Sequence, residues 1–314
     1  MPRPDGLTPA RAARRDFLRR LPALGALATL PTRALAEEAR LLTRRVPSSG
    51  EALPIVGLGT ARRYDDATRP EELAPLRATL ERFAAQGARL VDTAPSYGHA
   101  EAVVGQLVAE TRLRERLFLA TKVGASGREA GLAQIEDSFR RLRTASLDLI
   151  SVHNLRDTAT QLATLRELKA AGRIRYTGLT TSFDRQYADF ETTMKREQVD
   201  FVQVDYALDN RDAGERLLPL ARDRGMAVMV NLPFGRGRLF SAVQGRALPA
   251  WAGDFDCHSW AQFFLKYIVS HEAVTVVIPG MAKAGYVDDN LGAARGRLPD
   301  AATRRRMEAF IDAL

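Results

Sequence analysis

The chain has 314 residues, of which 46% are hydrophobic and 27% charged, which is typical of a soluble globular protein with two average domains or one large α/β barrel. Its net charge of +8 is uneven, because residues 1–36 carry +5 and the remainder only +3, so the main body shows no sign of a nucleic-acid-binding surface. A single cysteine, Cys257, excludes an internal disulfide, and no run of 18 apolar residues predicts a membrane span.

The first 36 residues have the layout of an export signal. Residues 14–19, RRDFLR, resemble the twin-arginine motif, and a modest apolar stretch and an A-x-A cleavage pattern at residues 34–36 follow them. The alternative is a basic amphipathic first helix of a cytosolic protein, but the prolines and the glycine in this segment disfavour a stable helix. We therefore expect a precursor that the twin-arginine translocase passes to the periplasm, or that is otherwise exported, and a domain spanning residues 37–314.

After this leader, eight short apolar runs alternate with helical patterns. The runs begin near Ile55, Arg89, Leu117, Leu147, Ile174, Phe201, Met226 and Val274. Continuous apolarity is expected of parallel strands that are covered on both faces. Apolar residues between the runs recur at steps of three and four, as in Leu73, Leu76, Leu80 and Phe83. Eight such units predict an α/β protein with a (β/α)8 TIM barrel. A doubly wound dinucleotide-binding fold would need a third glycine in GLGTAR, residues 57–62.

Two segments extend this plan. Residues 44–54, RRVPSSGEALP, predict an N-terminal β-hairpin that closes the far mouth of the barrel. Before the last strand an insertion, Phe234 to Asp256, predicts a long loop after strand seven, on the face where barrel active sites lie. We expect this candidate lid, together with residues 61–66 after strand one, to line the substrate pocket. Arg62 and Arg63 there are either binders of an anionic substrate or ordinary solvated side chains.

Four polar residues come at or just after the ends of neighbouring strands: Asp92 and Tyr97, then Lys122, then His153. Hydride transfer to a carbonyl leaves an alkoxide, which a tyrosine hydroxyl can protonate. A nearby ammonium lowers the tyrosine pKa from its usual value near ~10, a carboxylate keeps that ammonium charged, and an imidazole orients the carbonyl.

Each of these residues has a structural alternative. Asp92 could cap a turn, Tyr97 could be a packed loop aromatic, and His153 could be a hydrogen-bonded core histidine. Lys122 is harder to dismiss, because a buried lysine needs a partner. Their coincidence on consecutive strands favours a carbonyl-reduction site. No spacing of His, Glu or Asp indicates a metal site.

Four segments occur in order: DTAPSYGHAEAVVG, LFLATKVG, SLDLISVHN and AGRIRYTGLTTS. On these motifs residues 44–300 resemble the aldo-keto reductases. The resemblance implies reduction of an aldehyde or ketone by NADPH (or NADH), or the reverse, with Tyr97 as acid/base, Lys122 and Asp92 tuning it and His153 orienting the substrate. It also implies cofactor contacts at Gly59, Thr60, Thr180, Gln203, Asn231, Phe234, Gly235, Arg236, Asp289 and Asn290.

The match to this family is uneven on the cofactor side. Asn231 stands where the family usually has an aromatic ring that stacks on the nicotinamide, and Phe234 or Trp251 is a candidate replacement. The positions of the usual 2′-phosphate binders hold no cation, so that Lys283, Arg236 and Arg238 become candidates. The four intact site residues favour an enzyme, and we expect it to be monomeric or weakly associating. The departures leave open a non-catalytic, cofactor-binding barrel that acts as a periplasmic redox sensor or accessory subunit.

Overall fold

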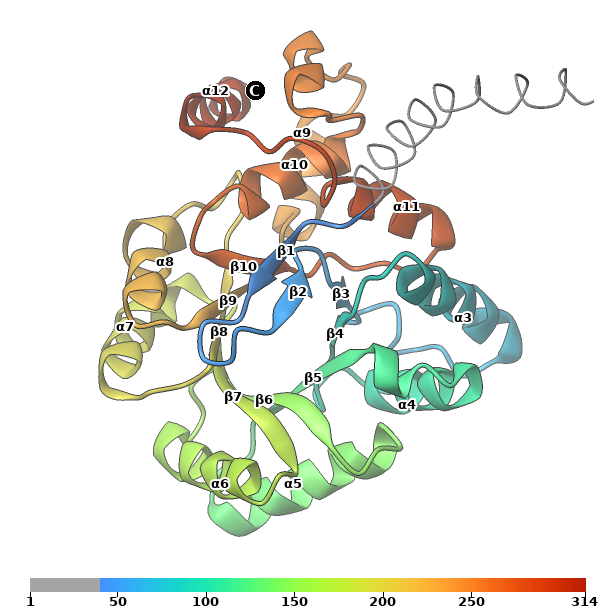
Figure 1. Cartoon of the computed structure of the whole chain (residues 1–314), viewed down its shortest axis with the longest axis vertical. Coiled ribbons are helices and arrows are strands. Elements are labelled where there is room, and N and C mark those ends of the chain that lie inside the picture. Colours follow the sequence, from blue (N-terminus) through green and yellow to red (C-terminus); the bar gives the residue numbers. More distant parts are fainter. Residues whose placement is uncertain (1–39) are drawn as a thin grey trace, which may run out of the picture. The chain divides into compact units, whose positions relative to one another are not determined.

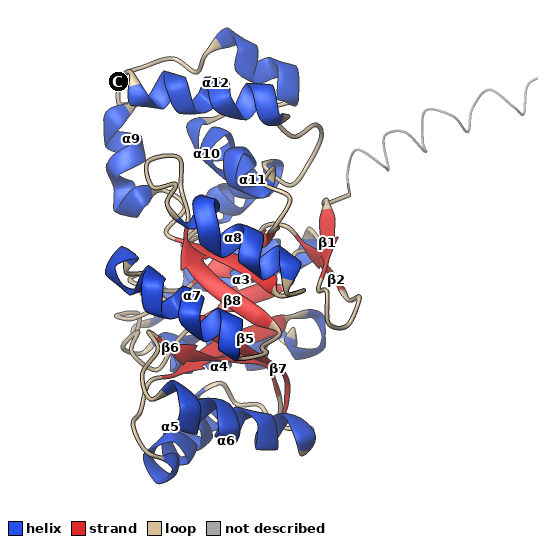
Figure 2. Cartoon of the chain, turned by 90° about the vertical axis from the view of Figure 1, so that its left-hand side faces the viewer, coloured by secondary structure: helices blue, strands red, loops and turns tan. Residues whose placement is uncertain are grey.

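The computed structural model describes residues 40–314, and the predicted signal peptide lies outside the described residues. Residues Leu41–Leu314 form one compact unit, with strands at its centre and helices around them (Figures 1 and 2). The hairpin predicted at residues 44–54 is confirmed: β1 (Thr43–Arg45) pairs antiparallel with β2 (Ala52–Pro54).

Eight parallel strands follow the hairpin and form one sheet in chain order. They are β3 (Leu58–Gly59), β4 (Leu90–Asp92), β5 (Phe118–Val123), β6 (Leu147–His153), β7 (Ile174–Thr180), β8 (Phe201–Asp205), β9 (Ala227–Asn231) and β10 (Val274–Val277). The first and last strands close the ring, because the amide of Gly57 donates to the carbonyl of Val277 at 2.8 Å and that of Gly59 to Pro279 at 2.9 Å. The predicted barrel is confirmed.

Helices pack on the outside of these strands, as the apolar spacing predicts. The helices are α3 (Pro70–Ala85), α4 (Ala100–Thr111), α5 (Arg128–Arg141), α6 (Thr158–Ala170), α7 (Tyr187–Arg196), α8 (Ala213–Asp223), α9 (Arg238–Ala242), α10 (Trp260–Val269), α11 (Ala284–Gly292) and α12 (Ala301–Asp312), with short 3-10 turns η2 (Arg114–Arg116), η3 (Asp184–Gln186), η4 (Gly235–Gly237) and η5 (Ala250–Phe255). On α3, the predicted stripe from Leu73 to Phe83 is buried. The helix and the following strand are joined through Gly87, whose φ of 87° favours glycine.

The barrel interior is closed at its N-terminal end by the hairpin. Val46 and Leu53 pack with an inner cluster that includes Phe118 and Tyr176. The hydroxyl of Tyr176, near the start of β7, donates to Ser49 Oγ at 2.7 Å. A ligand is therefore expected to enter from the opposite, C-terminal end of the strands.

The insertion after β9 is more ordered than the predicted loop. It contains η4, α9 and η5, because apolar residues such as Leu239 and Val243 are spaced to bury one face of a short helix. Phe240 of this segment packs edge-on against Phe264 of α10, with ring centroids 5.5 Å apart. The predicted long insertion is present, and its first half lines the cavity described below.

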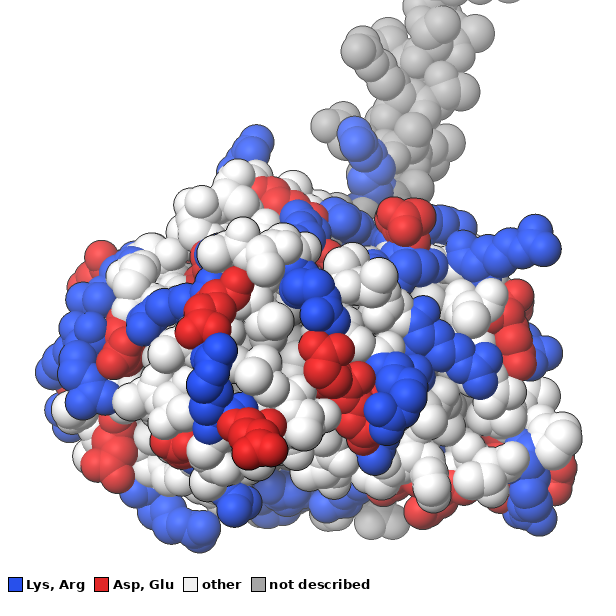
Figure 3. Space-filling model, turned by 90° about the horizontal axis from the view of Figure 1, so that it is seen from below, with Lys and Arg blue, Asp and Glu red and all other residues white. Residues whose placement is uncertain are grey.

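Surface charge on the face below the view of Figure 1 is mixed rather than of one sign (Figure 3). Arginines of α5 and α6 and their surroundings pair with acids, as in Arg128 with Glu167 at 2.7 Å and Arg173 with Glu136 at 3.1 Å. None of the helices within residues 40–314 has the length and apolar character needed to cross a membrane. In the same range, no group of His, Cys, Asp and Glu side chains is placed to hold a metal ion.

Candidate active site

Three neighbouring strands bring the predicted acid, lysine and histidine to one end of the barrel. Asp92 is the last residue of β4, Lys122 the second last of β5, and His153 the last of β6. Tyr97 follows β4 in the loop before α4. This loop turns at Gly98, where φ is 53° and an added Cβ would lie 3.0 Å from the carbonyl oxygen of Asp65. The tight turn brings the Tyr97 side chain back over the strand ends.

The ammonium of Lys122 is buried and fully coordinated. Its Nζ lies 2.8 Å from both carboxylate oxygens of Asp92 and 2.8 Å from the carbonyl oxygen of Thr93. Burial lowers the pKa of Lys122, but Asp92 and Tyr97 raise it more, so its net pKa lies above the usual value. The lysine therefore stays charged at neutral pH, as predicted. Thr93, the third oxygen, is a contact that the sequence pattern did not indicate.

Tyr97 lies directly beside this ammonium, which is 5.1 Å from the centre of its ring. Burial raises the pKa of the Tyr97 hydroxyl, and the nearby Lys122 opposes this shift without reversing it. Lys122 lowers the pKa of Tyr97, as predicted, but burial outweighs it, so the predicted net lowering of the pKa is wrong. Tyr97 consequently holds its proton at neutral pH, as a proton donor must.

His153 faces Tyr97 across the mouth of the barrel. Their rings are 6.3 Å apart between centroids and lie at 85° to each other. Burial, and then the charge of Lys122, lower the pKa of His153 to about 4. The imidazole is therefore neutral at physiological pH, with one N–H to donate to a carbonyl oxygen.

This low pKa predicts a pH-dependent stability difference between the protein and a His153→Gln variant. The unfolded histidine takes up a proton near pH ~6.5, whereas folded His153 does so only near pH 4. The contribution of neutral His153 to the free energy of unfolding is therefore fully present above the pKa of the unfolded histidine, and it decreases as the pH falls toward 4. We expect the melting temperature of wild type minus that of the variant to be larger at pH 7.5 than at pH 5. His271, whose pKa is also lowered to about 4, is present in both proteins. A difference in melting temperature that is the same at pH 5 and at pH 7.5 would contradict the lowered pKa of His153.

A second row of polar side chains lies level with His153. His153, Thr180 and Gln203 are ladder partners on β6, β7 and β8. The hydroxyl of Thr180 donates to Gln203 Oε1 at 2.6 Å, which leaves the amide nitrogen of Gln203 to bond Asp92. These two predicted cofactor residues therefore connect to the lysine site through hydrogen bonds across the barrel.

A cavity of about 400 Å³ opens beside Asp92 and Tyr97. Several predicted cofactor residues line it, namely Gly59, Thr60, Asn231, Phe234 and Arg236, along with Arg62, Arg63, Phe240, Gly280 and Tyr286. Asn231 donates through Nδ2 to the carbonyl of Thr181 at 3.2 Å, whereas its buried Oδ1 has no partner among the described residues. This orphaned acceptor, an apolar wall and arginines suit an amide-bearing ring joined to phosphates, so the residues fit a nicotinamide cofactor.

Other predicted cofactor residues do not line this cavity. Gly235 is buried with φ 55°, and an added Cβ would meet Asp209 at 2.2 Å, so its role is the turn itself. Asp289 accepts hydrogen bonds from Ser259 at 2.6 Å and Gln262 at 3.0 Å at the start of α10, and Asn290 is buried beside it.

Two candidate side chains are committed elsewhere. Trp251 packs against Phe263 and Phe310 with centroids 5.6 and 6.2 Å apart, so it cannot supply the stacking ring, whereas Phe234 remains in the cavity. Arg238 is paired with Asp209 at 2.9 Å, which leaves Arg236 as the cation of this segment that faces the cavity.

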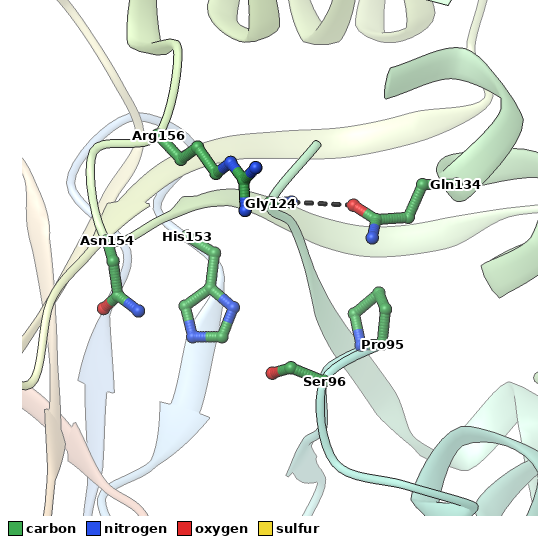
Figure 4. A pocket seen from close by; sticks show the side chains of 7 residues that line it. All are labelled: Pro95, Ser96, Gly124, Gln134, His153, Asn154 and Arg156. Atoms are coloured by element: carbon green, nitrogen blue, oxygen red, sulfur yellow. Dashed lines mark hydrogen bonds between the residues drawn. The ribbon is translucent and has the colours of Figure 1, made fainter. Parts of the chain in front are cut away.

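A second cavity, of about 580 Å³, is lined by His153 (Figure 4). Ser96, Gln134, Asn154 and Arg156 are among its lining residues. None of these four is among the site residues that the sequence predicts. The one available signal was the position of Asn154 and Arg156 immediately after the strand that ends in His153.

Comparisons with known proteins agree with this geometry. The model of the Aldo/keto reductase family matches residues 55–309. Methylglyoxal reductase YeaE of Escherichia coli (strain K12) is 35% identical over 260 residues, which cover 79% of this chain and 88% of that protein. A Klebsiella pneumoniae aldo/keto reductase solved with NADP and acetate is 26% identical with a TM-score of 0.71, over 87% of this chain and 95% of the other. One solved with NADPH is 27% identical with a TM-score of 0.71, over 86% and 95%. The chain therefore belongs to the aldo/keto reductase family.

Proposed function

We propose that this protein reduces a small aldehyde or ketone to the alcohol with NADPH, and catalyses the reverse oxidation when alcohol and NADP are supplied. The observation that carries the proposal is the buried Lys122, held by Asp92 at 2.8 Å and placed beside Tyr97 at the edge of a cavity. A structural ion pair would not require a tyrosine beside it and a neutral histidine whose ring lies 6.3 Å from that tyrosine.

The side chains divide the work of carbonyl reduction as follows. When bound, NADPH would supply the hydride, and the cavity residues Asn231, Phe234 and Arg236 would hold it. The neutral His153 donates its N–H to the substrate carbonyl oxygen and so orients and polarises it. Tyr97 gives its proton to the same oxygen as negative charge develops there. Lys122 then stabilises the phenolate that remains, and Asp92 keeps Lys122 charged and in place.

The choice of NADPH over NADH rests on relatives and on charge. Aldo/keto reductases from Klebsiella pneumoniae have been solved with NADP and with NADPH. In this chain Arg62, Arg63 and Arg236 line the cofactor-side cavity, and guanidinium groups suit a 2′-phosphate. Small dicarbonyls are sensible first substrates, because the Escherichia coli relative is named a methylglyoxal reductase.

The test is the oxidation of NADPH and of NADH by the purified protein with methylglyoxal and a panel of simple aldehydes. Turnover with NADPH and weaker turnover with NADH support the proposal. Tight binding of NADPH without turnover on any carbonyl would instead favour the cofactor-binding sensor or accessory subunit. Equal affinity for both cofactors would count against a 2′-phosphate site.

We also propose that the protein is exported by the twin-arginine pathway and acts as a monomer outside the cytoplasm. The support is the sequence of residues 1–36, with Arg14-Arg15 and the A-x-A pattern ending at Ala36. Replacing both arginines by lysine should retain the protein in the cytoplasm. Fractionation of cells that express the full chain, followed by size-exclusion chromatography of the periplasmic fraction, tests both points. Equal periplasmic amounts of the wild type and the double variant would contradict this route.

A further inference from the structure

We propose that the substrate carries an anionic group, a carboxylate or a phosphate, that binds the guanidinium of Arg156 in the cavity beside His153. The inference rests on the proposed reductase function, because it names the class of carbonyl compound that the same site accepts.

The position of this cavity makes it the substrate side of the site. His153 and Ser96 form part of its wall. Tyr97 lines the cofactor-side cavity, and its ring lies 6.3 Å from that of His153, so the two cavities meet at this pair of rings. A carbonyl held by Tyr97 and His153 would project the rest of the molecule into this space. Its volume of about 580 Å³ accommodates a small molecule with a charged end.

Arg156, whose side chain is exposed, forms no ion pair with an acidic side chain within residues 40–314. Its Nε donates to the hydroxyl of Ser126 at 3.1 Å, which fixes the plane of the guanidinium but does not neutralise it. On the adjoining helices, by contrast, Arg128 pairs with Glu167 and Arg166 with Glu197, each at 2.7–2.8 Å. The two terminal nitrogens of Arg156 remain for a bidentate contact to a carboxylate or phosphate.

Other groups in the cavity favour the same kind of ligand. Gln134 Oε1 accepts from the amides of Gly124 at 2.7 Å and Ala125 at 3.1 Å, and this fixes its amide nitrogen on the side away from Gly124 (Figure 4). That nitrogen and the hydroxyl of Ser96 add donors to the wall of the same cavity.

The loop that carries Arg156 is held in an unusual backbone conformation. Asn154, Leu155 and Asp157 have φ values of 53°, 57° and 49°, a region that non-glycine residues adopt only when their surroundings hold them there. The amide of Asn154 donates to Thr180 O at 2.8 Å, and Asp157 accepts from the amide of Gly127 at 2.7 Å. These bonds place Arg156 on the cavity wall before any ligand binds.

The anionic group of the substrate is not expected to bind Arg62, Arg63 or Arg236, because these three arginines line the cofactor-side cavity. Cofactor phosphates are their natural partners. Arg156 should therefore affect the substrate and not the cofactor, and this separates the two roles experimentally.

The experiment compares charged and neutral members of matched substrate pairs with the purified enzyme and NADPH. One pair is 4-carboxybenzaldehyde and its neutral methyl ester, and the other is glyceraldehyde 3-phosphate and glyceraldehyde. We expect kcat/KM to favour the anion about tenfold or more in at least one pair, and the preferred pair tells carboxylate from phosphate. Arg156→Gln should reduce this preference about tenfold, mainly through KM, and Arg156→Lys should retain part of it. Arg128→Gln, which alters a paired arginine on a neighbouring helix, should keep the wild-type preference.

The outcomes separate this inference from the function on which it rests. Turnover with no preference for the anion, or an equal loss for both members of a pair in Arg156→Gln, overturns the role of Arg156 while the reductase function stands. A large change in NADPH affinity in Arg156→Gln also overturns it, because it would place the arginine on the cofactor. Absence of turnover with every aldehyde instead removes the proposed function itself.

Discussion

Replacing Tyr97 with phenylalanine is expected to lower kcat for aldehyde reduction by about 10²–10⁴-fold while NADPH affinity stays unchanged. The phenylalanine ring keeps the edge-to-face contact with His153, 6.3 Å between centroids, and its place beside Lys122. What is lost is the hydroxyl alone, and with it the proton that neutralises the developing alkoxide. Stopped-flow or steady-state oxidation of NADPH measures kcat, and quenching of protein fluorescence measures cofactor affinity.

Tyr176→Phe is the matched control for this variant. Its hydroxyl bonds Ser49 and Glu51 at the hairpin end of the barrel, away from the strand ends that carry the site. It should cost about 1 kcal/mol of stability through the lost hydrogen bonds and leave kcat as in wild type. If Tyr97→Phe and wild type reduce aldehydes at the same rate, Tyr97 is not the proton donor.

The barrel and the four site residues Asp92, Tyr97, Lys122 and His153 could be predicted from the sequence, because simple physical requirements dictate them. Strands covered on both faces must be apolar along their whole length, and this is visible in LFLAT and LDLISVH. A lysine that ends such a strand must find a carboxylate, so Lys122 and Asp92 could be paired in advance. The hairpin turn follows from Gly50, and the end of α3 follows from Gly87.

The remaining features depend on packing that one sequence does not show. Trp251 joins the aromatic cluster of α10 and α12, and nothing in its neighbours indicates which way it turns. The left-handed backbone at Asn154 and Leu155 occurs without glycine, so no residue marks the loop that presents Arg156. The net direction of the Tyr97 pKa shift depends on how deeply its hydroxyl is buried, because burial and Lys122 act in opposite directions.

Removing the amine of Lys122 is expected to have the largest effect on stability as well as abolishing activity. In Lys122→Met the methionine fills the aliphatic space, but the carboxylate of Asp92, itself 4% exposed, loses both of its 2.8 Å bonds to Nζ. An unpaired buried charge of this kind costs about 3–5 kcal/mol in the free energy of unfolding. Urea denaturation measures this cost.

A double variant, Asp92→Asn with Lys122→Met, distinguishes a charge effect from a packing effect. It removes both charges, so we expect it to be inactive yet more stable than Lys122→Met, with a coupling energy of about 0.5–3 kcal/mol. In the single variant, burial raises the pKa of Asp92 with no lysine to oppose it. The folded variant then binds more protons than the unfolded chain above the unfolded carboxyl pKa, so its stability falls as the pH rises. The stability gap to wild type should therefore be smaller at pH 4.5 than at pH 7.5. A gap that is independent of pH, or a double variant no more stable than the single one, would mean that Lys122 stabilises this site by packing and not by its charge.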